Sequence, residues 1–177
     1  LSSVVVSGAF EGLERLLLDG NDIGDFGMKA FARAINTHAL GCLEELWLNQ
    51  NQIGDAGAIA FAEACAPPAS SAEERRHHTG SQTGACLQSL ALLSLATNRI
   101  SSPGMAALAN SFSGGALAAL SRFWIQNQFE FDSASMRPSQ GARALLSDAT
   151  SVRGIALQIS GDDSEMQMVP GLASSMA

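Results

Sequence analysis

The stretch from Leu43 to Gly57, LEELWLNQNQIGDAG, sets the pattern for most of the chain. It reads L-x-x-L-x-L-x-x-N-x-I-G-D-x-G, and a close copy, LERLLLDGNDIGDFG, runs from Leu13 to Gly27. Two further copies begin at Leu90 and Leu120, and a partial fifth copy begins at Val152. The four complete copies are spaced by 30, 47 and 30 residues, so the middle interval holds one repeat plus an insert. Self-similarity at a period of this size predicts a repeat solenoid.

Each copy divides into a strand, a turn and a helix. In the strand, two apolar residues alternate with an outward-facing one. These apolar pairs are Leu16/Leu18, Leu46/Leu48, Leu93/Leu95, Phe123/Ile125 and Ile155/Leu157. The turn places an asparagine two residues before an isoleucine, and we expect the amide to bond backbone groups that the turn leaves unpaired. The turn pairs are Asn21/Ile23, Asn51/Ile53 and Asn98/Ile100, whereas the fourth copy has Gln128 and Glu130.

The helix of each copy begins near a polar residue and continues as an apolar stripe. An aspartate or serine two residues before the helix glycine predicts a helix cap. The four predicted caps are Asp25, Asp55, Ser102 and Ser139. Counted from the glycines, the positions predicted to be buried are +3, +4, +7 and +8. They are Ala30, Phe31, Ala34 and Ile35, then Ala60, Phe61, Ala64 and Cys65, then Ala107, Leu108 and Phe112, then Ala144, Leu145 and Ala149.

This pattern resembles the leucine-rich repeat family, and the 30-residue unit with its I-G-D-x-G element resembles the ribonuclease-inhibitor-like subclass. That subclass includes Ran GTPase-activating proteins, tropomodulins and the sensor arrays of NLR-type receptors. The resemblance implies an α/β solenoid of about four repeats plus partial ends, with parallel strands on the concave face and helices on the convex face. We expect the array to occupy residues 1–160, with inserts at about 66–84 and 129–138 and a polar tail over 161–177.

The composition limits the classes of function. The chain has 177 residues and a net charge of −7 with a single lysine, Lys29, which argues against a protein that follows nucleic-acid phosphates. No stretch approaches the ~20 uninterrupted apolar residues of a membrane helix. Three cysteines and the lack of an N-x-S/T site favour a reducing, cytoplasmic location. The first residue is Leu, and Phe10 occupies a position that precedes each motif, so we expect a fragment of a longer array.

No motif in the sequence indicates catalysis or metal binding. His77 and His78 lie between Cys65 and Cys86, but the spacing fits no zinc-ligand pattern, and a Cys65–Cys86 disulfide is a minor alternative. A phosphate-binding G-x-x-x-x-G-K-[ST] loop is absent, and no nucleophile stands near a base in a recognisable order. We therefore expect no enzyme activity, no cofactor and no metal.

The outward residues of the strands are the ones available for recognition. The central column is Leu17, Trp47, Ser94, Trp124 and Ala156. The flanking columns are Arg15, Glu45, Leu92, Arg122 and Gly154, and Asp19, Asn49, Ala96, Gln126 and Gln158. Both tryptophans fall in the central column, two strands or ~10 Å apart, and Trp and Arg are enriched at binding hot spots. The predicted contact residues are Trp47, Trp124, Arg15, Glu45, Asn49, Arg122 and Gln126.

We expect a non-catalytic module that binds a protein partner through its concave strands, without nucleic acid or membrane. In an alternative interpretation the two tryptophan rings merely cover the small residues Ser94 and Ala96, or are covered by the inserts. Alternative functions are a regulator of a small GTPase, with Asp162, Asp163 and Glu165 as a thin acidic tail, and a sensor fragment of an NLR-like immune receptor. A degraded gene product without selected function is a further alternative. Uncapped ends predict marginal stability or self-association.

Overall fold

The strands and helices alternate along the whole described chain. The computed structural model describes residues 12–35, 40–66, 87–128 and 139–159. The strands are β1 (Arg15–Leu17), β2 (Glu45–Trp47), β3 (Leu92–Ser94), β4 (Arg122–Trp124) and β5 (Ala156–Gln158). The helices are α2 (Gly24–Ile35), α3 (Asp55–Cys65), α4 (Ser102–Ser113) and α5 (Gln140–Val152). Nearly all of both predicted inserts, and the predicted tail, lie outside the described residues.

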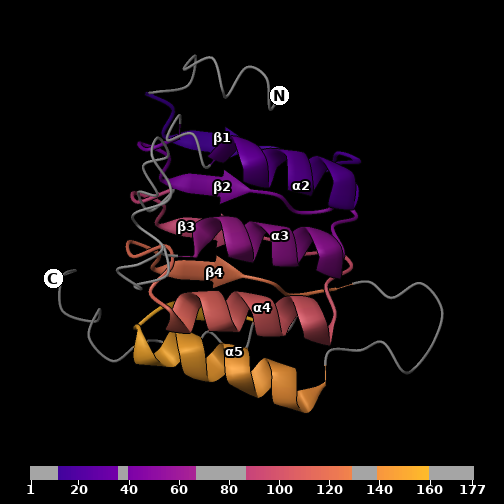
Figure 1. The fold of residues 1–177 in the computed structure, drawn as a ribbon, viewed down its shortest axis with the longest axis vertical. Helices are drawn as coiled ribbons and strands as arrows, with labels where there is room; N and C mark the ends of the chain where they lie inside the picture. The colour runs from indigo at the N-terminus through magenta and orange to yellow at the C-terminus, as the bar shows by residue number, and fades with distance from the viewer. Residues whose placement is uncertain (1–11, 36–39, 67–86, 129–138, 160–177) are drawn as a thin grey trace, which may run out of the picture.

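The strands form one parallel sheet in chain order, β1-β2-β3-β4-β5. The helices stack side by side in a second layer that covers one face of this sheet (Figure 1). A parallel sheet whose helices all lie on one face is the solenoid arrangement that the repeats predict. We call the sheet face turned away from the helices the concave face. No helix of the described ranges is long and apolar enough to cross a membrane.

The core lies between the two layers, where equivalent residues of successive repeats meet. The pairing register places Leu16, Leu46, Leu93, Phe123 and Leu157 beside one another. The rings of Phe112 on α4 and Phe123 on β4 pack edge to face, with centroids 5.2 Å apart. Full burial of each large apolar side chain contributes roughly 1.5–3 kcal/mol, and only stacked neighbours provide that burial.

The register confirms the predicted alignment of four copies and corrects the fifth. Leu157, not Ile155, pairs with Phe123, so the predicted fifth strand is displaced by two residues. Val152, predicted to be the first buried residue of that copy, is 88% exposed at the end of α5. Two connections differ in length: residues 125–139 join β4 to α5 where residues 95–101 join β3 to α4, and residues 153–155 join α5 to β5 where residues 114–121 join α4 to β4. A fixed spacing from the preceding motif therefore fails in this copy.

The buried stripe of the helices agrees with the prediction in part, because positions +4 and +8 are buried in the first three helices, as are Ala34 in α2 and Ala149 in α5. The positions buried in every one of the first three helices, counted from the glycines, are +1, +4, +5 and +8, so +1 and +5 join the predicted stripe. In the first three helices these residues are Met28, Phe31, Ala32 and Ile35, then Ala58, Phe61, Ala62 and Cys65, then Met105, Leu108, Ala109 and Phe112. The predicted +3 residues are exposed or half-buried instead. In α5 the series begins at Ala142 rather than Gly141, so Leu146 is fully buried and the predicted Leu145 is 54% exposed.

Buried amides join the turns of neighbouring repeats, as the asparagine pattern predicts. Asn98 Nδ2 donates to three carbonyl oxygens at 2.9–3.2 Å, those of Leu48, Leu95 and Ala96. Asn98 Oδ1 accepts the N–H groups of Asn51 and Ile53, both at 3.0 Å. Gln128, although it departs from the asparagine pattern, continues the ladder, because its Oε1 accepts the Ile100 N–H at 3.0 Å. The ladder therefore extends into the fourth repeat.

A second set of polar contacts holds the helix N-termini together. Asp55 is the first residue of α3, yet its Oδ1 accepts the N–H groups of Ser101 and Gly104, at 2.8 and 2.9 Å, where α4 begins. Its Oδ2 also accepts the Ser101 hydroxyl at 2.6 Å. The first N–H groups of a helix have no intrahelical partner, and here the preceding repeat supplies it. Asp55 therefore caps the next helix rather than its own.

The same contact recurs at the other junctions. Asp25 Oδ1 accepts the N–H groups of Gly54 and Gly57, both at 2.8 Å, and Ser102 Oγ accepts the Ser139 N–H at 2.6 Å. The prediction that Asp25, Asp55 and Ser102 cap their own helices is thus wrong. Ser139 alone of the four predicted caps acts on its own helix, where its Oγ accepts the Ala142 N–H.

The bridging aspartate explains the helix glycine. A Cβ added to Gly104 would lie 2.6 Å from Asp55 Oδ1 and 2.7 Å from Ile100 Cγ2, both closer than real Cβ contacts. In α5 the equivalent position is Ala142, and the side chain that reaches this helix N-terminus from the preceding repeat is Ser102, which accepts the Ser139 N–H. Glycine at this position leaves room for both the carboxylate of the preceding repeat and the isoleucine of its own turn.

Candidate functional site

The concave face carries three rows of side chains. The first row is Arg15, Glu45, Leu92, Arg122 and Ala156. The central row is Leu17, Trp47, Ser94, Trp124 and Gln158. The third row follows the strands and contains Asp19, Asn49, Ala96 and Gln126. These are the predicted columns for four strands, whereas in β5 the residues Ala156 and Gln158 each move by one column because of the shifted register.

Trp47 and Trp124 meet above β3 in the centre of this face. Their ring centroids are 5.1 Å apart and their planes are 85° apart, an edge-to-face contact. Ser94 lies between them in the register and is fully buried. The predicted separation of ~10 Å is the distance between the backbones of alternate strands. It is wrong for the rings, because the small side chain of Ser94 lets the two rings lean towards each other. Both side chains remain half-buried, so part of each ring faces solvent.

The two tryptophans differ in their polar contacts. The indole N–H of Trp47 donates to Glu45 Oε2 at 3.1 Å on the same strand. The indole N–H of Trp124 has no hydrogen-bond partner within the described ranges. Edge-to-face contact contributes roughly 0.5–1.5 kcal/mol beyond burial. Glu45 and the ring contact therefore fix the orientation of the pair, and Trp124 keeps one donor available.

The first row holds two arginines, one on the strand next to that of Trp47 and one on the strand of Trp124. Arg15 on β1 and Arg122 on β4 are exposed, and neither guanidinium has a hydrogen bond or ion pair with any described residue. Leu92 lies between Glu45 and Arg122 and is 1% exposed, although the sequence pattern predicts an outward side chain. Arg15 is the direct register partner of Glu45, whereas Leu92 separates Glu45 from Arg122.

The third row is largely structural. The Asn49 N–H donates to Asp19 Oδ1 at 2.7 Å, and Asn49 Oδ1 accepts the Ala96 N–H at 2.8 Å and the Ser94 hydroxyl. Asn49, predicted as a contact residue, therefore bonds β1 to β2 and β2 to β3. Gln126 is half-buried, and its buried Oε1 has no partner among the residues described. Among the described residues of this row, Gln126 is thus the one whose buried side-chain acceptor has no partner.

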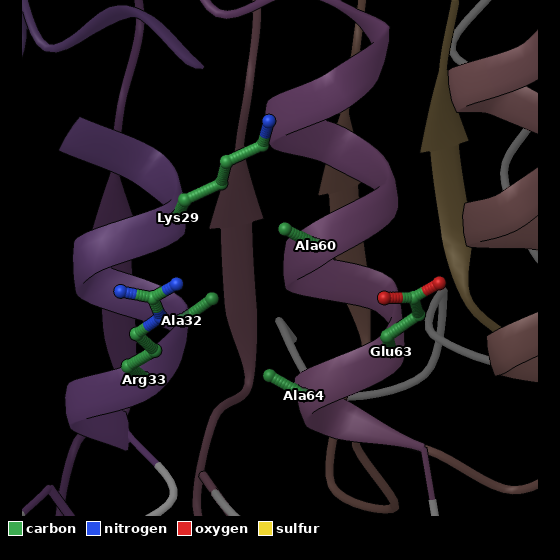
Figure 2. Close-up of a pocket in the computed structure, with 6 residues that line it drawn as sticks. All are labelled: Lys29, Ala32, Arg33, Ala60, Glu63 and Ala64. Atoms are coloured by element: carbon green, nitrogen blue, oxygen red, sulfur yellow. The ribbon is translucent and has the colours of Figure 1, made fainter. Parts of the chain in front are cut away.

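The helix layer holds a shallow groove of about 400 Å³ between α2 and α3. It is lined by Lys29, Ala32, Arg33, Ala60, Glu63 and Ala64. Lys29 reaches across it toward α3, whereas Glu63 points away from it (Figure 2). Over the described parts of the chain, no three His, Cys, Asp or Glu side chains gather as metal ligands would. The sequence alternatives at His77, His78 and Cys86 lie outside these parts.

Comparisons with known proteins agree with the repeat architecture of the chain. The model of the leucine-rich repeat family matches residues 13–32 and 42–62, the first two copies. The fold is a leucine-rich repeat solenoid. A solved structure titled "Leiomodin-1 Actin-Binding Site 2 (ABS2)" is similar to it with a TM-score of 0.64, over 92% of this chain and 78% of that one. At 12% identity this leucine-rich repeat likeness is one of fold. No curated protein sequence matches the chain.

Proposed function

We propose that this leucine-rich repeat solenoid is a non-catalytic module that binds a protein partner through its concave face. The observation that carries the proposal is the ordered tryptophan pair beside two arginines that have no partner among the described residues. Tryptophan and arginine dominate binding hot spots, and an aromatic ring that is already held in place loses little freedom on binding. The strand face of a solenoid presents such side chains at fixed spacing.

The contacts of the predicted site residues divide them by role. Trp47, Trp124, Arg15 and Arg122 have surface available for a partner, and Gln126 adds an acceptor. Glu45 orients Trp47, and Asn49 holds three strands together. We therefore propose the first four as the principal contacts, with Gln126 at the edge and with Glu45 and Asn49 in support.

The similar structure suggests one partner to test directly. Its title names it as an actin-binding site, and co-sedimentation of this chain with actin filaments tests whether the likeness extends from fold to ligand. A ribonuclease-inhibitor-like subclass, a cytoplasmic location and self-association through the array ends also belong to this proposal. For regulation of a small GTPase, and for a sensor fragment of an immune receptor, the described residues offer no specific support.

The proposal is tested by selecting displayed peptides or protein fragments on the immobilised chain. Recovered binders are measured against Trp124→Ala and against Phe26→Ala, a matched aromatic control that is 90% exposed at the start of α2. We expect Trp124→Ala to weaken binding by about 2 kcal/mol, or roughly 30-fold, and Phe26→Ala to leave it unchanged. Equal binding by both variants, each folded by circular dichroism, would show that the concave face is not the site.

A further inference from the structure

The concave face carries a charge pattern that bears on the chemistry of its partner. Arg15 and Arg122 stand at positions of one row that are three strands apart, or ~14 Å at the usual strand spacing. Both side chains are exposed and without a partner among the described residues. A guanidinium prefers to bind a carboxylate through two parallel hydrogen bonds. Two separated sites for carboxylates are therefore present on this face.

The carboxylates of the same face leave these two sites open. Glu45 receives the indole N–H of Trp47, and Asp19 receives the backbone N–H of Asn49. Both acidic groups thus bond within the sheet, and neither pairs with Arg15 or Arg122. Glu45 lies between the two arginines in the row and would repel a third carboxylate placed there. The arginines accept acidic groups, and the space between them does not.

The centre of the face is apolar. The edge-to-face tryptophans fill it, and Leu17 beside Trp47 is 65% exposed. Isolated exposed apolar residues need no explanation, but here an exposed leucine and two half-exposed rings adjoin one another in a single row. An apolar side chain of a partner would cover them, and the indole N–H of Trp124 would donate to a carbonyl oxygen of its backbone.

On the basis of the proposed function, we propose that this face binds an extended peptide segment in which two acidic residues, four positions apart, flank an apolar residue. In an extended chain, residues i, i+2 and i+4 point to the same side, and i and i+4 are ~13–14 Å apart. That distance matches the separation of Arg15 and Arg122, with the apolar residue over the tryptophans. The segment crosses the strands rather than extending the sheet.

The net charge of −7 on the whole chain favours a basic partner at long range. Charges farther away than ~8 Å are largely screened at physiological salt, so the groups in direct contact decide the preference. Those groups are the two unpartnered arginines. The two arginines therefore predict a preference for an acidic peptide, whereas the net charge of the chain predicts a preference for a basic one. A binding experiment distinguishes these two outcomes.

The test uses the full chain and three synthetic peptides, Glu-Ser-Leu-Ser-Glu and its Gln-flanked and Lys-flanked counterparts, capped at both ends. Both tryptophans of the chain lie in the proposed site and the chain has no tyrosine, so intrinsic fluorescence reports on this site. We expect the Glu peptide to bind at least tenfold more tightly than either counterpart, and to lose affinity when sodium chloride is raised from 0.05 to 0.5 M. A Gln or Lys peptide that binds as tightly, or no fluorescence response to any peptide, would overturn the inference.

Variants separate the arginines from the general charge of the protein. Arg122→Gln and Arg15→Gln should each weaken the Glu peptide about fivefold or more, and Arg33→Gln on α2, equally exposed but in the helix layer, should not. Equal losses in all three variants would contradict the placement. If selected ligands still depend on Trp124 but show no preference for acidic residues, this inference fails and the proposed function stands.

Discussion

The junction between α3 and α4 gives the sharpest test of how the repeats are joined. In Gly104→Ala, the added Cβ would lie 2.6 Å from Asp55 Oδ1, and the carboxylate must move. Its bonds to the N–H groups of Ser101 and Gly104 would then lengthen or break. Loss of a helix cap costs about 0.5–2 kcal/mol, overpacking adds about 1–3 kcal/mol, and the helix propensity of alanine returns about 1 kcal/mol. We expect a net destabilisation of roughly 2 kcal/mol.

The structure also contains the compensating change. At the next junction Ser102 reaches the N-terminus of α5, which has Ala142 in the glycine position and begins at a serine cap, Ser139, as α4 begins at Ser101. The double variant Asp55→Ser/Gly104→Ala reproduces the serine and the alanine of that junction, while Ile100 Cγ2 stays 2.7 Å from the added Cβ in both Gly104→Ala variants. Asp55→Ser alone should cost about 1–2 kcal/mol, because it loses a charged acceptor of three hydrogen bonds. We expect the double variant to be at least ~1 kcal/mol more stable than the sum of the single changes, a favourable coupling between residues in contact.

Urea unfolding, followed by far-ultraviolet circular dichroism, measures these free energies. Gly141→Ala is the matched control, since it lies in the first turn of α5 and its Cβ would have nothing closer than Ser139 Oγ at 3.9 Å. It should raise the unfolding free energy by about 0.5–1 kcal/mol. Strict additivity of the Asp55 and Gly104 changes, or a stabilising effect of Gly104→Ala like that of the control, would refute the cross-repeat cap.

Three further predictions concern the turns and the concave face. Asn98→Ala should destabilise the chain by roughly 3 kcal/mol or more in urea unfolding, because it leaves buried backbone groups of two repeats unpaired, whereas the exposed Asn21→Ala should cost under about 1 kcal/mol. Thr97→Asn should raise the free energy of unfolding by about 0.5–1 kcal/mol, and the melting temperature with it, because Thr97 has a φ of 58° that asparagine tolerates better than a β-branched residue. An unchanged melting temperature would argue against backbone strain at Thr97. Ser94→Leu should separate the tryptophan rings and reduce their near-ultraviolet circular dichroism, and an unchanged spectrum would contradict a contact that depends on a small residue.

The sequence by itself determined the solenoid, its strands and its outward rows. Those features follow from local alternation and from a repeat period, which each copy carries within its own 30 residues. Leu46 and Asn51 illustrate this, because one is buried by its position in a strand and the other by the turn that it closes. Alternation within each strand likewise predicts that the two tryptophans lie in one row.

Only the tertiary structure decided how one repeat acts on the next. Asp55 has a good cap sequence for α3, but the stacking distance brings its carboxylate to the N-terminus of α4. Ser94 has the position of an outward residue, yet two large rings on neighbouring strands close over it. Leu157 takes its place in the sheet because the connections before and after α5 differ in length from those around α4, not because of any residue in the fifth copy. Contacts across repeats depend on distances between backbones, which a pattern within one repeat does not contain.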